Sequence, residues 1–195
     1  MEKTDLENLG FPVAGIGWRT LAFLADSLLL LLLLIAVLFI GFGEQCNEFA
    51  EKLIAFQEDY RKIVALGDLE RLQKFQTEIL DFRQSPVCET LGNVFTYGGL
   101  ALAFFYFFIG EFFFGGTSLG KRIVRIKTLS VNGEKLTAVQ CGLRSFWKAL
   151  TFMPTNFIVV ILIIANAYVP FFNKLRRGWH DKTSGTIVVN DKYFL

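Results

Sequence analysis

The sequence contains few of the residues that build metal sites and nucleic-acid interfaces. Its 195 residues include one histidine, His180, and three cysteines. This set leaves too few ligands for a transition-metal cage, and we expect neither a metal nor a cofactor. Charged residues make up only 19% of the chain, and no basic tract is interleaved with aromatic residues. We therefore expect no nucleic-acid partner.

Apolar residues, in contrast, are in excess. They account for 53% of the chain, and the mean hydropathy is +0.44, whereas soluble domains contain about 45 to 50% apolar residues. The excess is concentrated in three stretches, 28–40, 94–109 and 157–172. We therefore predict an all-α polytopic membrane protein with three to four transmembrane helices, and the lipid bilayer as its first partner.

The first predicted transmembrane helix covers residues 18–41. At a rise of 1.5 Å per residue it is about 36 Å long, enough to cross a hydrocarbon core of about 30 Å. The preceding leader, residues 1–17, is acidic, whereas a signal peptide has a positively charged start, so we expect the helix to be retained. The second predicted transmembrane helix, residues 92–114, is of similar length.

Charge counts predict the orientation of the connecting segments. Segment 42–91 has six basic and ten acidic residues, loop 115–151 has seven basic and one acidic, and the tail 173–195 has five basic and two acidic. Lys and Arg accumulate on the cytoplasmic side of a membrane. We therefore place segment 42–91 outside, and the N-terminus, the loop and the tail in the cytoplasm of a multi-pass membrane protein.

Segment 42–91 reads as a hairpin of two amphipathic helices. Apolar residues recur at spacings of three and four on both sides of a turn at Gly67-Asp68. Cys46 and Cys88 flank this pair of helices, and we favour a disulfide between them over two free thiols. Cys141 falls on the cytoplasmic side, where we expect it to stay reduced.

The cytoplasmic loop 115–137 predicts a small β structure. β-branched residues surround Asn132-Gly133, the strongest short signal for a β-hairpin. A third strand is available at 186–189, so the fold includes a cytoplasmic β-hairpin or a three-stranded sheet.

The segment 138–172 must then cross the membrane twice or not at all. We predict a membrane helix pair broken at Pro154, in which 138–153 is the first helix and the second returns to the cytoplasmic tail 173–195. The alternative is an amphipathic helix on the cytoplasmic surface followed by one crossing, which would leave the tail outside.

Four charged residues are expected to form a polar membrane centre: Arg19, Asp26, Glu111 and Arg144. Asp26 lies about 12 Å below Trp18 along its helix, where an ionised carboxylate needs a partner. Matching depths predict one contact between Arg19 and Glu111 and another between Asp26 and Arg144, with Lys148 nearby. The ion pairs would either hold helices together or allow Asp26 to titrate during transport.

Two shorter motifs are better explained without catalysis. The stretch 115–121 has the glycine and lysine spacing of a phosphate-binding loop, but Arg122 replaces the magnesium-binding hydroxyl and no strand precedes it, so we expect a tight turn with Lys121 and Arg122 at lipid headgroups. In 176–181 we expect Gly178 to stop a helix, Trp179 to anchor it at the interface, and Asp181 to form an ion pair or cap. His180 has no legible nucleophile, so we expect no catalytic residues and no enzyme.

Three blocks resemble the signature of the RDD family of bacterial membrane proteins: 18–26, 116–122 and 177–186. The arginine and two aspartates that name the family correspond to Arg19, Asp26 and Asp181. The hairpin 42–91 looks like an insertion. The signature positions are Arg19, Asp26, Gly116, Gly120, Lys121, Arg177, His180 and Asp181.

The resemblance implies transport, because sodium/proton exchange has been attributed to some members of the family. Our leading hypothesis is a transport protein for a small ion or solute, coupled to protons or sodium, that works as a homo-oligomer. The alternative is a non-catalytic membrane scaffold or assembly factor that binds a membrane protein partner through the 42–91 hairpin.

Overall fold

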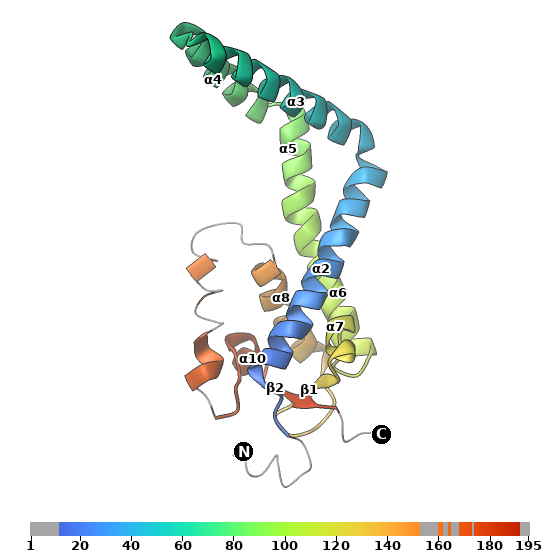
Figure 1. Ribbon diagram of the computed structural model, residues 1–195. Helices are drawn as coiled ribbons and strands as arrows, with labels where there is room; N and C mark the ends of the chain where they lie inside the picture. Colours follow the sequence, from blue (N-terminus) through green and yellow to red (C-terminus); the bar gives the residue numbers. More distant parts are fainter. Residues whose placement is uncertain (1–11, 153–159, 162–163, 165–167, 173, 192–195) are drawn as a thin grey trace. The chain divides into compact units, whose positions relative to one another are not determined.

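The computed structural model describes residues 12–152, 160–161, 164, 168–172 and 174–191 (Figure 1). The fold divides into two compact units. One unit is formed by residues 33–98. The other is formed by residues up to 32 together with those from 99 onward. The chain is mostly helical, with one small sheet.

Two helical stretches are long and apolar enough to cross a membrane. The first is α2, Ile16–Gly41, and the second runs from Pro86 to Phe113. The second consists of α5 (Pro86–Asn93), a short π-helical stretch (Val94–Gly98) and α6 (Gly99–Phe113). The first stretch contains the whole span predicted at 18–41. The second contains the span predicted at 92–114 except for residue 114. Exposed leucines and phenylalanines along them are the surface that a lipid-facing helix presents.

The unit formed by residues 33–98 contains the predicted helical hairpin. Helix α3 (Gly43–Leu66) ends at Gly67, which has a φ of 65° and closes the helix in the left-handed conformation. Asp68 then caps α4 (Leu69–Arg83) by accepting a hydrogen bond from the amide of Arg71. Aromatic pairs join the two helices: Phe49–Phe82, Phe56–Phe75, Phe56–Phe82 and Tyr60–Phe75. The turn at Gly67-Asp68 is confirmed (Figure 1).

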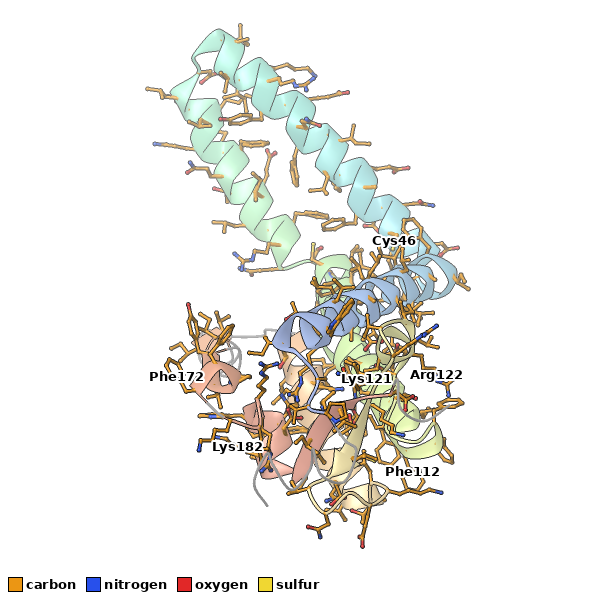
Figure 2. All side chains as sticks on the ribbon, turned by 60° about the horizontal axis from the view of Figure 1, so that its bottom comes forward. Cys46, Phe112, Lys121, Arg122, Phe172 and Lys182 are labelled. Carbon is orange, nitrogen blue, oxygen red and sulfur yellow. The ribbon has the colours of Figure 1, made fainter. Side chains whose placement is uncertain are left out.

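The predicted disulfide between Cys46 and Cys88 is wrong, because both thiols are free. Cys88 does not lie at the base of α4. The chain turns at Ser85, whose hydroxyl caps the separate helix α5, and Cys88 belongs to that helix. The Cys46 thiol, labelled in Figure 2, instead contacts the carbonyl oxygen of Leu38 at 3.7 Å.

The sheet has two antiparallel strands, β1 (Ile126–Ser130) and β2 (Thr186–Asn190), with Thr128 opposite Val188. The strand expected at 186–189 is therefore confirmed, whereas the hairpin within 123–137 is wrong. Asn132-Gly133 does form a turn, with the Gly133 amide bonded to the carbonyl of Ser130. After the turn, one backbone hydrogen bond returns to β1, from the amide of Ser130 to the carbonyl of Glu134 at 3.1 Å. Residues 134–137 form no second strand, and the next helix starts at Ala138.

That helix, α8, covers Ala138–Phe152. Its start is a reciprocal cap in which the side chains of Thr137 and Gln140 each bond the other's backbone amide. Pro154, where we predicted a break, lies outside the described residues. The crossing of the membrane by 138–172 therefore stays a prediction.

Three short helices complete the description. They are α7 (Leu119–Ile123), a 3-10 turn (Val169–Phe172) and α10 (Trp179–Thr183). Gly178 precedes α10 as its N-cap, so the expectation that Gly178 stops a helix is wrong. In the unit formed by residues up to 32 and from 99 onward, α2, α6 and α8 share an apolar core formed by Leu30, Ala103, Phe107 and Ala149.

Candidate functional site

Of the four charged residues expected at the polar membrane centre, Asp26, Glu111 and Arg144 are buried, with exposed fractions of 2%, 1% and 1%, and Arg19 is partly buried. Asp181, which was not expected there, is also buried, with an exposed fraction of 0%. A buried ionised group is costly unless it is paired or hydrogen-bonded. The partners of each carboxylate therefore determine what this part of the fold does.

Asp26, on α2, is held by hydrogen-bond donors that carry no charge. Its Oδ1 accepts from the hydroxyl of Tyr106 at 2.5 Å and from the amide of Gly120 at 2.7 Å, and its Oδ2 accepts from the hydroxyl of Ser118. The predicted contact with Arg144 is therefore wrong. The carboxylate is instead positioned by the start of α7, which approaches α2 closely.

Gly120 makes this approach sterically feasible. A Cβ atom at this position would lie 2.1 Å from the carbonyl oxygen of Ala22 and 2.8 Å from Oδ1 of Asp26. Gly116 is constrained in the same way, since its φ is +83° and a Cβ there would lie 2.0 Å from the carbonyl oxygen of Thr128. Both signature glycines therefore fit positions that larger residues cannot occupy.

Glu111, on α6, contacts three cations through one oxygen. Its Oε1 lies 2.6 Å from Nζ of Lys148, 2.7 Å from Nζ of Lys121 and 3.0 Å from Nε of Arg144. The predicted pair of Glu111 with Arg19 is wrong. Among the described residues, Oε2 of Glu111 has no hydrogen-bond partner.

Lys121 is buried and does not reach the headgroup position that we expected. Its ammonium also bonds the Thr128 hydroxyl at 2.5 Å and the Gly116 carbonyl at 3.3 Å. Burial lowers the pKa of Lys121 well below its ordinary value, and Glu111 opposes that shift. Arg122, labelled in Figure 2, is exposed. Its guanidinium lies over the ring of Phe114.

Asp181, on α10, combines the two roles expected of it. It pairs with Arg19 at 3.1 Å and with Arg144 at 2.5 Å, and its Oδ2 accepts a hydrogen bond from the Gly178 amide at 3.2 Å. Burial alone would raise the pKa of Asp181, but Arg144, His180 and Arg19 outweigh burial and hold the pKa well below its usual range. Both the ion pair and the cap are confirmed.

Arg144 joins the two acidic centres. Its Nε contacts Glu111 while its Nη1 contacts Asp181 and the hydroxyl of Thr186 at 2.6 Å. A continuous charge cluster results, which we define as Arg19, Glu111, Lys121, Arg144, Lys148 and Asp181. The helical spacing of Arg144 and Lys148 is the sequence signal that could have placed both on Glu111.

The two remaining signature residues surround Asp181. Nη2 of Arg177 donates to the backbone carbonyl of Asp181 at 3.2 Å, and Nε2 of His180 lies 3.3 Å from Oδ1 of Asp181. Burial, together with the nearby Arg144 and Lys148, lowers the pKa of His180 to about 4. His180 is therefore neutral at neutral pH. Within the described ranges no group of acidic, histidine or cysteine side chains is arranged to hold a metal ion.

A cavity of about 360 Å³ opens beside the charge cluster. Helices α2, α8 and α10 and the turn at 169–172 contribute to its lining. The charged or titratable residues of its lining are Arg19, Asp26, Lys121, Arg144, Lys148, His180 and Asp181. Its apolar lining includes Ile16, Phe23, Ile126, Pro170, Phe171 and Val188.

Comparison with known proteins identifies one family. The sequence profile of the RDD family matches residues 13–185, which include the first two signature blocks and all but the last residue of the third. No curated protein and no solved structure matches the chain.

Proposed function

Because the chain belongs to the RDD family, we propose that it is a membrane transport protein for a small ion or solute, coupled to protons or sodium. One observation carries this proposal: seven charged or titratable side chains line a single cavity in a protein with two candidate membrane spans. Ionisable residues are rare in membrane helices and mark substrate or proton pathways when they are present.

The proposed setting is the bacterial inner membrane, with the N-terminus in the cytoplasm. A bundle of three or four helices is thin for a water-lined pathway, so the transport proposal includes a homo-oligomer. Measuring the mass of the purified protein in detergent tests this part, because a monomeric mass alone would contradict it.

We further propose that the chain binds and moves its ligand without covalent chemistry. Asp181, which contacts the imidazole of His180, is already paired with Arg19 and Arg144. These ion pairs support a structural role for the carboxylate rather than the orientation of a general base.

Ion flux in vesicles made from purified protein alone tests the transport proposal. We expect proton- or sodium-driven flux that Asp26→Asn abolishes while membrane levels of the protein stay unchanged. Glu51→Gln, an exposed position on α3, is the matched control and should transport normally. Flux that is absent from the parent protein, or equal in Asp26→Asn, would remove the proposal.

The second candidate function, a scaffold that holds a partner, is favoured by the surface of the α3–α4 hairpin. Several apolar side chains on these helices are exposed: Leu53, Ile54, Val64, Leu66, Leu69, Ile79 and Leu80. A pull-down that is stoichiometric with one other protein, and is lost on deletion of 49–82, would favour the scaffold. Leu53→Glu combined with Leu80→Glu should also release that partner, without removing the aromatic pairs that join the helices.

A further inference from the structure

The charged residues that line the cavity present hydrogen-bond donors that remain available. Among the described residues, the Lys148 ammonium has one acceptor, Oε1 of Glu111, although an ammonium carries three N–H groups. Nε and Nη1 of the buried Arg144 contact Glu111, Thr186 and Asp181, and its Nη2 makes no hydrogen bond within the described part of the chain. Lys121, by contrast, already contacts three acceptors.

The carboxylates beside the cavity are already compensated. Asp26 accepts three hydrogen bonds, and Asp181 pairs with Arg19 and Arg144. Two arginines and two lysines line the cavity against these two carboxylates, so an entering cation would be repelled by the excess positive charge. An anion would meet the open donors of Lys148 and Arg144 directly, and charge-assisted hydrogen bonds of this kind are the strong ones.

The apolar lining of the cavity restricts the ligand further. It includes Phe23, Ile126, Pro170 and Phe171. These residues offer apolar surface and no hydrogen-bonding side chain. A small inorganic anion would leave that surface exposed to water, whereas an alkyl chain would cover it.

We propose that the cavity binds an amphipathic carboxylate, whose two oxygens accept from Lys148 and Arg144 and whose short alkyl chain lies against Phe23, Ile126 and Phe171. The ligand would come either from fatty acids of the bilayer or from a free carboxylate in water. This inference deepens the proposed function, because it names the ligand class of the same cavity, but binding itself requires no transport.

Calorimetric titration of the purified protein in nanodiscs with octanoate tests the inference. We expect saturable binding of octanoate, and at least tenfold weaker binding of the neutral octanol and of the cationic octylamine. Lys148→Met should weaken octanoate binding about tenfold or more. Lys121 and Arg144 still compensate Glu111 in this variant. Lys182→Met, an exposed position on α10 (Figure 2), should leave binding unchanged.

A second variant fills the cavity and leaves its charges in place. Thr151 lines the cavity one turn beyond Lys148 on α8, so Thr151→Phe should abolish octanoate binding. Val139→Phe, exposed on the same helix, is the matched control. Thermal unfolding of each variant verifies that it is folded. Equal binding of octanoate by parent and Thr151→Phe, or equal affinity for octanol and octanoate, would overturn the inference.

Two further measurements distinguish the sources of the ligand. Fatty acid extracted with the purified parent, but not with Thr151→Phe, identifies the bilayer as the source, whereas octanoate binding without co-purified fatty acid identifies a free carboxylate. If acetate binds as tightly as octanoate, the alkyl chain contributes nothing to binding, and the proposal that the ligand is amphipathic is overturned. Octanoate binding without any ion flux would support this inference and remove the transport proposal. Ion flux without octanoate binding would support the transport proposal and overturn this inference.

Discussion

Arg19 and Asp181 form an ion pair with an N–O distance of 3.1 Å, although they stand 162 positions apart in the chain. The pair joins the start of α2 to α10 and thereby connects the first and last signature blocks. Arg19 also donates to the backbone carbonyl oxygens of Val188 and Arg176. One arginine therefore attaches the first described helix to both the last helix and the last strand.

Removing the carboxylate of this pair should be strongly destabilising. In Asp181→Asn, Arg19 and Arg144 would both lose a buried counter-ion, and breaking such a pair costs about 3 to 5 kcal/mol. Denaturant unfolding of the purified protein measures this loss. Asp59→Asn, which breaks an exposed pair with Lys62, is the control and should cost less than about 1 kcal/mol. Similar losses for both variants would contradict the prediction.

The neutral state of His180 predicts a pH dependence of stability. The pKa is about 4 in the folded chain against 6.5 for an ordinary histidine, so the unfolded chain binds more protons between these values. Stability should therefore fall by about 3 kcal/mol as the pH drops from 6.5 to 4. Asp181 has a lowered pKa and loses its contribution only below its ordinary value of 3.8.

The variant His180→Gln isolates this effect. The substitution removes the titrating group, and we expect the slope of the free energy of unfolding against pH between 6.5 and 4 to become flatter. Charged groups near His180 are Asp181, Arg144, Lys148 and Glu111, and all remain in the variant. An unchanged slope would assign the dependence to another group.

Substituting the glycine that lies against Asp26 should disrupt the packing of α7 on α2. Gly120→Ala would place a methyl group 2.1 Å from a backbone oxygen, and we expect it to lower the free energy of unfolding by roughly 1 to 3 kcal/mol. Gly142→Ala is the control, since nothing lies within 4 Å of its Cβ position. In the interior of a helix it should stabilise by about 0.5 to 1 kcal/mol.

The free thiols predict a simple labelling pattern. Cys46 and Cys88 are half-buried, whereas Cys141 has no exposed surface. A thiol reagent should therefore react with two cysteines of the folded protein and with three after unfolding. Gel mobility should be the same with and without reductant. Two thiols that become reactive only after reduction would restore the disulfide.

The sequence was sufficient for the parts of the fold that depend on local patterns. Apolar residues three and four apart predicted the helices of the hairpin, and Gly67-Asp68 predicted their turn because a glycine ends one helix and an aspartate caps the next. The turn at Asn132-Gly133 was also correct. The strand expected after it does not form, because a single backbone hydrogen bond, from Ser130 to Glu134, follows the turn. Thr137 and Gln140 then start α8.

The partners of the buried charges were beyond such patterns. Rise per residue gives the depth of a side chain along a helix, but it does not give the direction in which the side chain points. The glycines at 115 and 116, both with positive φ, reverse the chain after α6. This reversal brings Lys121 to Glu111 and Gly120 to Asp26. Pairing by depth alone therefore matched Arg19 and Arg144 with the wrong carboxylates.

The long separations within the charge cluster also fix the order in which a growing chain completes it. The donors to Asp26 are translated 80 to 94 residues after it, and the carboxylate that pairs with Arg19 follows only after 162. Helix α2 thus leaves the ribosome long before its charges have partners. A chain released before Asp181 is translated carries Arg19 and Arg144 without the carboxylate they share, so translation of the last signature block is the step that completes the ion-pair network.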